Sequence, residues 1–134
     1  MNLTNTVQSI YVAFGKGDVP VILECLAEDV VWEYAYEHAS NQVPWLKTRQ
    51  GKDEVAAFFG DLAALDFHRF EATELLEGAG VVVALVHLES TVRATGKLIA
   101  ENDEAHIWRF NASGKVARFR HCADTFQQWQ AMQR

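Results

Sequence analysis

The sequence contains only two cysteines, Cys25 and Cys122, and it has no CxxC or HExxH motif. A disulfide framework or a zinc site needs more such residues at characteristic spacings. The longest apolar run, residues 81–86, is far shorter than the roughly 20 residues that span a bilayer. The N-terminal MNLTNTVQSI lacks the basic and apolar regions of a secretory signal. These absences predict a cytoplasmic protein without a membrane segment, a disulfide bond or a metal.

Basic residues are also scarce, since 12 Lys and Arg stand against 18 Asp and Glu, for a net charge of −6. No cluster of basic side chains could neutralise a nucleic-acid backbone or an anionic membrane surface. The glycine-containing segment FGKGD at 14–18 does not connect a strand to a helix, as a phosphate-binding loop does. We therefore expect no nucleic acid or membrane partner and no cofactor.

The 134 residues are 49% hydrophobic and 11% aromatic, which suits one domain, 1–134, with one core. Val7, Ile10, Tyr11 and Phe14 recur at helical spacing and predict a first helix. A second helix is expected after Asp18. A third is expected to begin at residue 52 or 53, and a short last helix at residue 124 or 125.

Alternating apolar and polar residues predict strands at 29–38, 66–77, 81–93, 97–110 and 115–122, with a loop at 39–50. Glycine-containing breaks separate the last four strands, so they should form an antiparallel meander. The expected fold class is α+β: a curved antiparallel sheet wrapped around three helices of the N-terminal half as a conical barrel, with a short C-terminal helix. Such a sheet encloses a hollow in which a small molecule can bind.

Three segments, IYVAFGKGDVPVILECLAEDVVWEY, GKDEVAAFF and AHIWRFNASGKVARFRHCADT, resemble the SnoaL-like branch of the nuclear-transport-factor-two-like superfamily. This superfamily contains ketosteroid isomerases and polyketide cyclases. The resemblance covers nearly the whole chain and implies the conical-barrel fold. It does not imply one activity, because isomerases, cyclases, epoxide hydrolases, dehydratases and non-enzymatic domains share this fold.

The resemblance argues against steroid isomerisation. The isomerase's general-base aspartate falls at Tyr34, and its oxyanion tyrosine at Ile10, with the neighbouring Tyr11 expected to turn away. Its protonated aspartate falls at His106, and a supporting tyrosine at Phe59. The base is therefore missing. Polyketide cyclases are closer, because they place a histidine near position 106. They also place an acid/base aspartate at the position where this chain has His121.

A four-residue hairpin loop, NASG, would pair His106 with Phe119 and Glu104 with His121. Because side chains alternate along strands, these residues and Trp108 would share the face toward the hollow. A carboxylate opposite His121 would favour its charged form, so His121 would be the acid and His106 the neutral base. Alternatively, both histidines are half-buried strand residues without a catalytic role.

The other expected pocket residues are aromatic: Trp32, Tyr34, Trp45, Phe58, Phe59, Trp108 and Phe119. Core packing is the alternative for Trp32, Tyr34 and Trp108 and the favoured role of Phe58 and Phe59. The Tyr34 hydroxyl could donate to a substrate oxygen, and Trp45 could form a lid. In the acidic run 101–104, alternation would place Glu101 and Asp103 on the outer face, paired with Arg93. That split argues against a metal site.

The outer sheet face would carry polar residues, namely His87, Glu89, Arg109, Arg118 and Arg120. In this fold the outer face often forms a dimer contact, so we expect a homodimer, with a solvated face as the alternative.

The function expected from sequence is general acid–base chemistry on a small hydrophobic carbonyl or hydroxyl compound, of isomerase, cyclase or hydro-lyase type. His106, His121 and Tyr34 would be its catalytic residues. The alternative is a non-catalytic ligand-binding or dimerisation module.

Overall fold

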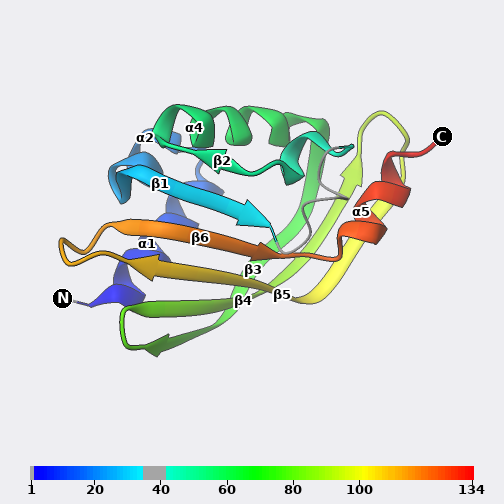
Figure 1. The fold of residues 1–134 in the computed structure, drawn as a ribbon. Helices are drawn as coiled ribbons and strands as arrows, with labels where there is room; N and C mark the ends of the chain where they lie inside the picture. The colour runs from blue at the N-terminus through cyan, green and yellow to red at the C-terminus, as the bar shows by residue number, and fades with distance from the viewer. Residues whose placement is uncertain (1, 35–41) are drawn as a thin grey trace.

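A computed structural model describes residues 2–34 and 42–134 (Figure 1). The chain begins with helices and continues into long strands. In order, its elements are α1 Leu3–Gly15, α2 Val19–Glu24, β1 Leu26–Tyr34, the 3-10 turn η1 Pro44–Leu46, β2 Arg49–Gln50, α4 Lys52–Asp61, the 3-10 turn η2 Leu62–Ala64, β3 Leu65–Gly78, β4 Val81–Val92, β5 Leu98–Phe110, β6 Val116–Cys122 and α5 Thr125–Met132. The strand expected at 29–38 begins earlier, and its last four positions lie outside the described residues.

Short polar side chains begin three of the helices, because they accept hydrogen bonds from backbone N–H groups that have no partner within the helix. The Asn2 side chain accepts from the Asn5 N–H at 3.1 Å, and Asp18 accepts from the Val21 N–H at 3.4 Å. Asp124 accepts from Gln127 in the same way at 3.0 Å. The second and last helices therefore begin where the sequence predicted.

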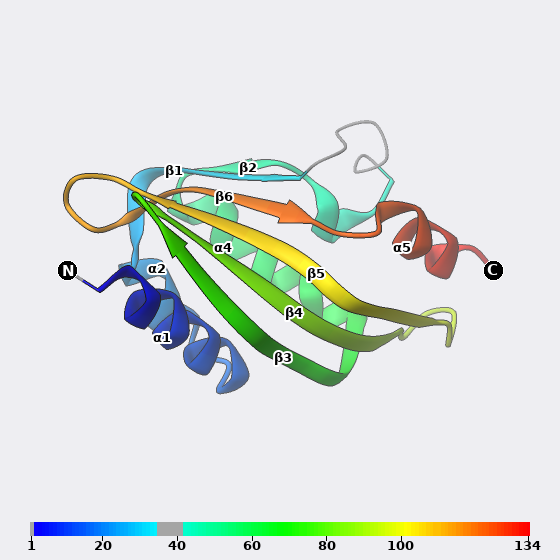
Figure 2. The same cartoon turned by 90° about the horizontal axis from the view of Figure 1, so that it is seen from below.

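The sheet has six strands in the order β2-β1-β6-β5-β4-β3. Strands β3 to β6 form the predicted antiparallel meander, while β1 lies parallel to β6. Figure 2 shows the sheet curving from β1 to β3, with α1, α2 and α4 on one side and α5 at its end. The α+β class with a curved, unclosed sheet is therefore confirmed.

Alternation along β4 separates the inner face of the sheet from the outer one. Val82, Ala84, Val86 and Leu88 are buried against the helices, while the intervening side chains are only partly buried. Helix α1 contributes Val7, Ile10 and Ala13 to the same core. Burial of each large aliphatic side chain stabilises the fold by about 1.5–3 kcal/mol. Among the described helices, none has the length and apolarity to cross a membrane.

The register between β5 and β6 differs from the prediction by two residues. His106 pairs with His121, and Trp108 pairs with Phe119. The hairpin loop has five residues rather than four, because Phe110 pairs with Val116 and an irregularity follows Arg109. A shift of two residues leaves every side chain on the same face, so the inner-face assignment is unaffected.

Candidate active site

Five predicted site residues lie together on the inner face of two neighbouring strands. Glu104, His106 and Trp108 come from β5, and Phe119 and His121 come from β6. All five line a cavity of about 70 Å³ between the sheet and the helices. That volume is room for on the order of five water molecules. The cavity is therefore small, but its own aromatic side chains do not fill it completely.

Glu104 lies between two imidazoles. Its Oε1 forms a short hydrogen bond with His121 Nε2, and its Oε2 lies 3.7 Å from His106 Nε2. The Glu104 side chain is only 1% exposed. The two imidazole rings face each other with centroids 4.5 Å apart and planes at 85°. One buried carboxylate thus contacts both candidate catalytic histidines.

Tyr11 completes this hydrogen-bonded chain, although the sequence argument expected it to turn away. Its hydroxyl lies 2.6 Å from His106 Nδ1 and accepts a hydrogen bond from Trp108 Nε1 at 3.1 Å. With the Trp108 donor already on its oxygen, the Tyr11 O–H is free to donate to His106 Nδ1. A neutral His106 then carries its proton on Nε2, toward Glu104. The helical spacing of Tyr11 with Val7 and Phe14 was the signal for this inward position.

Burial and neighbouring charges set the protonation of the cluster. Burial alone would raise the pKa of Glu104, but His121 and His106 outweigh it and hold that pKa well below its usual range. Burial, followed by the charge of His121, lowers the pKa of His106. Burial also raises the pKa of the Tyr11 phenol. At neutral pH the cluster therefore holds an ionised Glu104, a neutral His106 and a protonated Tyr11.

Aromatic rings form most of the remaining wall. Trp32 stacks on Phe119 with ring centroids 3.9 Å apart, and both Phe58 and Phe59 pack against Trp32. Phe70 lines the opposite side near Tyr11, at a centroid distance of 6.0 Å. These residues belong to the core and also line the cavity, so the two roles weighed for Phe58 and Phe59 are not exclusive.

Trp45 lines the cavity, whereas Tyr34 is not among the residues that line it. The Tyr34 hydroxyl donates to the Trp45 carbonyl, and Tyr34 does not line the cavity. It is therefore not placed to donate to a substrate. Trp45 is no exposed lid, because it is 2% exposed and its Nε1 donates to Gln128 Oε1 at 2.7 Å. Its indole joins η1 to α5 and forms part of the cavity wall.

The acidic run at 101–104 does not alternate as predicted. Leu88 pairs with Glu101 and Val86 with Glu104, so β5 bulges outward by one residue at 102–103. The expected pairing of Glu101 with Arg93 is wrong, because Arg93 lies 3.8 Å from Asp66 instead. Glu101 accepts hydrogen bonds from the Asp124 N–H and the Gln128 amide at the start of α5.

Glu104, His106 and His121 are also of the types that bind transition metals, and their ligand atoms lie within 4.8 Å of one another. Ligands around a tetrahedral ion at about 2.0–2.1 Å are roughly 3.3 Å apart. The cluster would have to contract to hold such an ion. Its observed geometry instead fits protons shared between carboxylate and imidazole.

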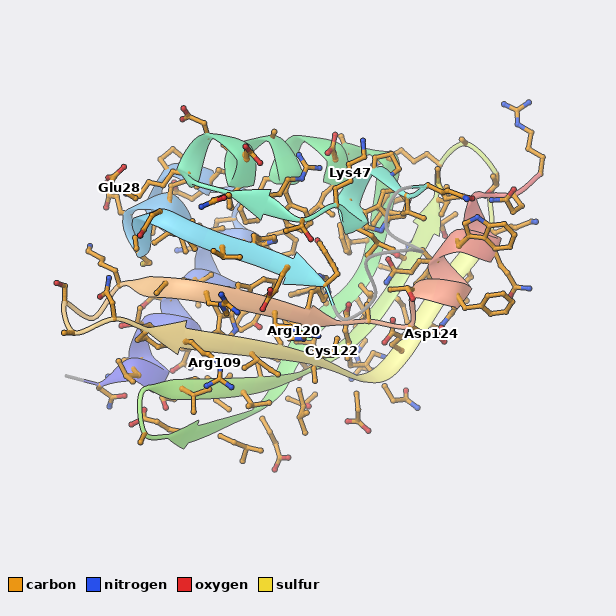
Figure 3. The ribbon with its side chains drawn as sticks, in the orientation of Figure 1. Glu28, Lys47, Arg109, Arg120, Cys122 and Asp124 are labelled. Carbon is orange, nitrogen blue, oxygen red and sulfur yellow. The ribbon has the colours of Figure 1, made fainter. Side chains whose placement is uncertain are left out.

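The outer face of the sheet carries the polar residues that the sequence placed there. Figure 3 shows Arg109 and Arg120, and Arg109 pairs with Arg118 across β5 and β6. Arg118 and Arg120 lie 3.4 and 3.5 Å from the Glu33 carboxylate. On β4 another histidine and carboxylate, His87 and Glu89, form a hydrogen bond of 2.8 Å.

This fold agrees with comparisons to known proteins. The sequence profile of the SnoaL-like domain matches residues 7–119, and the chain belongs to that family. The structure is similar to an NTF2-like protein of unknown function from Burkholderia pseudomallei, with 26% identity, a TM-score of 0.86 and full coverage of both chains. A Burkholderia thailandensis NTF2-like protein is also 26% identical, with a TM-score of 0.85 and coverage of 100% and 99%.

A third similar structure is TerC co-crystallised with polyporic acid, with 22% identity, a TM-score of 0.81 and coverage of 97% and 98%. At that identity the likeness concerns the fold alone. A search of curated proteins finds no match. The comparisons therefore place the chain in a family but leave its reaction to be argued from its own residues.

Proposed function

We propose that this chain is an enzyme that moves a proton in a small hydrophobic carbonyl or hydroxyl compound by general acid–base catalysis. Isomerisation, cyclisation and loss of water all require such a step. The observation that carries the proposal is the buried Glu104 between His106 and His121, at one end of a cavity otherwise lined mainly by aromatic rings. These groups can accept and donate protons where water is largely excluded.

Hydrogen-bond partners assign the roles. His121 bonds Glu104 through Nε2, and its buried Nδ1 has no partner, so the neutral ring presents a lone pair on Nδ1. A carboxylate behind an imidazole fixes its tautomer and stabilises the imidazolium that forms. His106 carries its proton on Nε2 because Tyr11 occupies Nδ1. We therefore assign His121 as the base and His106 as the donor, which reverses the roles expected from sequence.

In the proposed step, His121 Nδ1 takes a proton from the carbon next to a substrate carbonyl. The electron pair of that C–H bond moves onto the carbonyl oxygen, where the His106 Nε2–H stabilises the developing charge. The proton then returns from His121 to a different substrate atom. Glu104 stays ionised throughout, and no electrons leave the substrate.

Deuterium exchange tests this step without knowledge of the natural substrate. The wild-type protein in D₂O should accelerate exchange of the α-protons of 1-indanone or 4-chromanone, followed by NMR. His121→Asn should lower the enzymatic rate at least about 100-fold. His87→Asn is the matched control, because His87 also bonds a carboxylate through Nε2 but lies outside the cavity. No exchange above background with either ketone, or equal rates in wild type and His121→Asn, would contradict the proposal.

The second candidate is a non-catalytic module that binds a small apolar molecule. The small cavity with its largely aromatic wall favours it, since such a wall supplies binding without chemistry. Under this alternative, His106→Gln changes ligand affinity and no exchange occurs in any variant. Under the enzymatic proposal, His106→Gln lowers exchange while affinity stays within a few-fold.

A further inference from the structure

Unpaired polar atoms cluster around the cavity. Among the described residues, six buried side-chain polar atoms lack a hydrogen-bond partner, and five belong to residues that line the cavity. These are Trp32 Nε1, Ser90 Oγ, Glu104 Oε2, His106 Nε2 and His121 Nδ1, of which Glu104 Oε2 and His106 Nε2 face each other at 3.7 Å, beyond hydrogen-bond distance. A buried polar group without a partner costs about 1–3 kcal/mol. Their concentration around one cavity offers a bound molecule several polar groups to pair with.

Ser90 stands apart from the others. It lies on β4 and is 0% exposed, between Phe67 on β3 and Ile99 on β5, its partners in the sheet. Both of these apolar neighbours also line the cavity. Val86, which pairs with Glu104, precedes Ser90 by four residues, or about 13 Å along a strand. The Glu104 cluster and the unpaired Ser90 hydroxyl thus lie at different positions along the cavity wall.

The charge of the lining limits what can bind near Ser90. No lysine or arginine is present among the described residues that line the cavity. A carboxylate or phosphate buried there would have no cationic partner, at a large cost in free energy. A neutral hydroxyl or carbonyl oxygen, in contrast, could pair with the Ser90 hydroxyl, which can donate or accept a hydrogen bond.

We propose that the cavity binds an elongated, uncharged aromatic compound with an oxygen function at each end, one at the His106–His121 end and one hydrogen-bonded by Ser90. The proposal deepens the proposed function and rests on it, because it takes the histidine end as the reacting end. The aromatic wall selects a flat ring, and the small volume of the cavity limits the compound to one ring with a short substituent. Ser90 is then a specificity-determining residue.

Two phenols of nearly equal shape test the Ser90 contact: tyrosol, with a terminal hydroxyl, and 4-propylphenol, with a methyl group in its place. Calorimetry gives the dissociation constant of each with wild type and with Ser90→Ala. The variant should weaken the binding of tyrosol relative to that of 4-propylphenol by about three- to tenfold, which is the contribution of one neutral hydrogen bond. Thr91→Ala is the control, because Thr91 is the next residue of β4, on the outer face, and bonds the exposed His68. It should leave the ratio of the two dissociation constants unchanged.

A third probe tests the charge of the substrate. 4-Hydroxyphenylacetate places a carboxylate near Ser90, and wild type should bind it at least about tenfold more weakly than tyrosol. The unliganded Ser90→Ala protein should also melt at the same temperature as wild type or a few degrees higher, because the lost hydroxyl has no partner to lose.

Any of three results overturns the proposal. The first is an unchanged ratio of the tyrosol and 4-propylphenol dissociation constants in Ser90→Ala. The others are binding of 4-hydroxyphenylacetate as tight as that of tyrosol, and no binding of any of the three phenols. These measurements need no turnover, so their failure is distinguishable from failure of the proposed reaction. If deuterium exchange is absent but Ser90→Ala changes the ratio, the subsite stands and the acid–base function fails.

Discussion

His106 and His121 face each other directly across β5 and β6, with perpendicular rings whose centroids are 4.5 Å apart. Two positive charges this close in a buried site would repel strongly. Glu104 bonds His121 and compensates a charge on that ring, whereas the pKa of His106 is lowered. The two histidines thus differ in their surroundings, and this difference permits separate acid and base roles.

Glu104→Gln should reduce both stability and activity. Since the folded pKa of Glu104 lies below its unfolded value, its ionised form stabilises the fold above the unfolded pKa, and this contribution is lost as the pH falls through the folded value. Urea unfolding at pH 7 should show a loss of about 3 kcal/mol, which shrinks in acid. Ketone exchange should fall about 10²- to 10⁴-fold. Equal stability at pH 7 would show that the buried carboxylate is not ionised.

Two tyrosines offer a matched comparison. Tyr11→Phe removes the hydroxyl that bonds His106, so exchange should fall about 10- to 100-fold and its pH dependence should change. Tyr34→Phe removes only a donor to the Trp45 carbonyl. It should cost about 1 kcal/mol of stability and leave exchange within a few-fold. The rate of exchange should be measured as a function of pH for both variants. Similar losses of exchange rate in Tyr11→Phe and Tyr34→Phe would refute the role given to Tyr11.

The stability of the protein should depend on pH through Glu101. Burial, followed by the charge of Glu104, raises the pKa of Glu101 from 4.5 to about 7. Between these values the unfolded state is ionised while the folded state keeps its proton, so this group favours folding less as pH rises. Because Glu101 is partly solvated, the effect should be about 1 kcal/mol. In chemical denaturation, the stability of Glu101→Gln relative to wild type should therefore increase between pH 5 and pH 8. The same pH dependence of the free energy of unfolding in both proteins would contradict this expectation.

Metal removal should leave activity unchanged. The Glu104–His121 hydrogen bond joins two of the candidate ligands directly, and the proposed proton transfer uses protein groups alone. Exchange rates should be the same before and after dialysis against EDTA, and added Zn²⁺ should inhibit by competing for the imidazoles. Loss of exchange after EDTA and recovery with a metal would instead establish a metal-dependent reaction.

The outer sheet face is proposed to form a homodimer. Leu76, Val83 and Ile107 are aligned across β3, β4 and β5, next to Arg120 on β6. Leu76 is 53% exposed, which leaves apolar surface on a partly polar face. Leu76→Arg should shift sedimentation toward a monomer, whereas Val12→Arg, at an exposed site on α1, should not. A wild-type protein that sediments as a monomer at micromolar concentrations would refute the dimer.

Local sequence patterns determined the elements of this protein. The helical spacing of Val7, Tyr11 and Phe14 and the alternation along 81–93 and 97–110 depend only on which face of a helix or strand is buried. They therefore predicted the helices, the meander and the inner face that carries Glu104, His106 and His121. An error of two residues in register did not alter these faces, because strand side chains repeat every two residues.

Only the tertiary structure decided the contacts between elements. Whether Tyr11 bonds His106, whether Tyr34 bonds Trp45 and where β5 bulges all depend on how distant segments pack together. A single-residue bulge placed Glu101 on the face opposite to that given by simple alternation. Hydrogen bonds require atoms within about 3 Å. Periodicity defines a face but not a distance of that size, so the roles of the two histidines followed from packing.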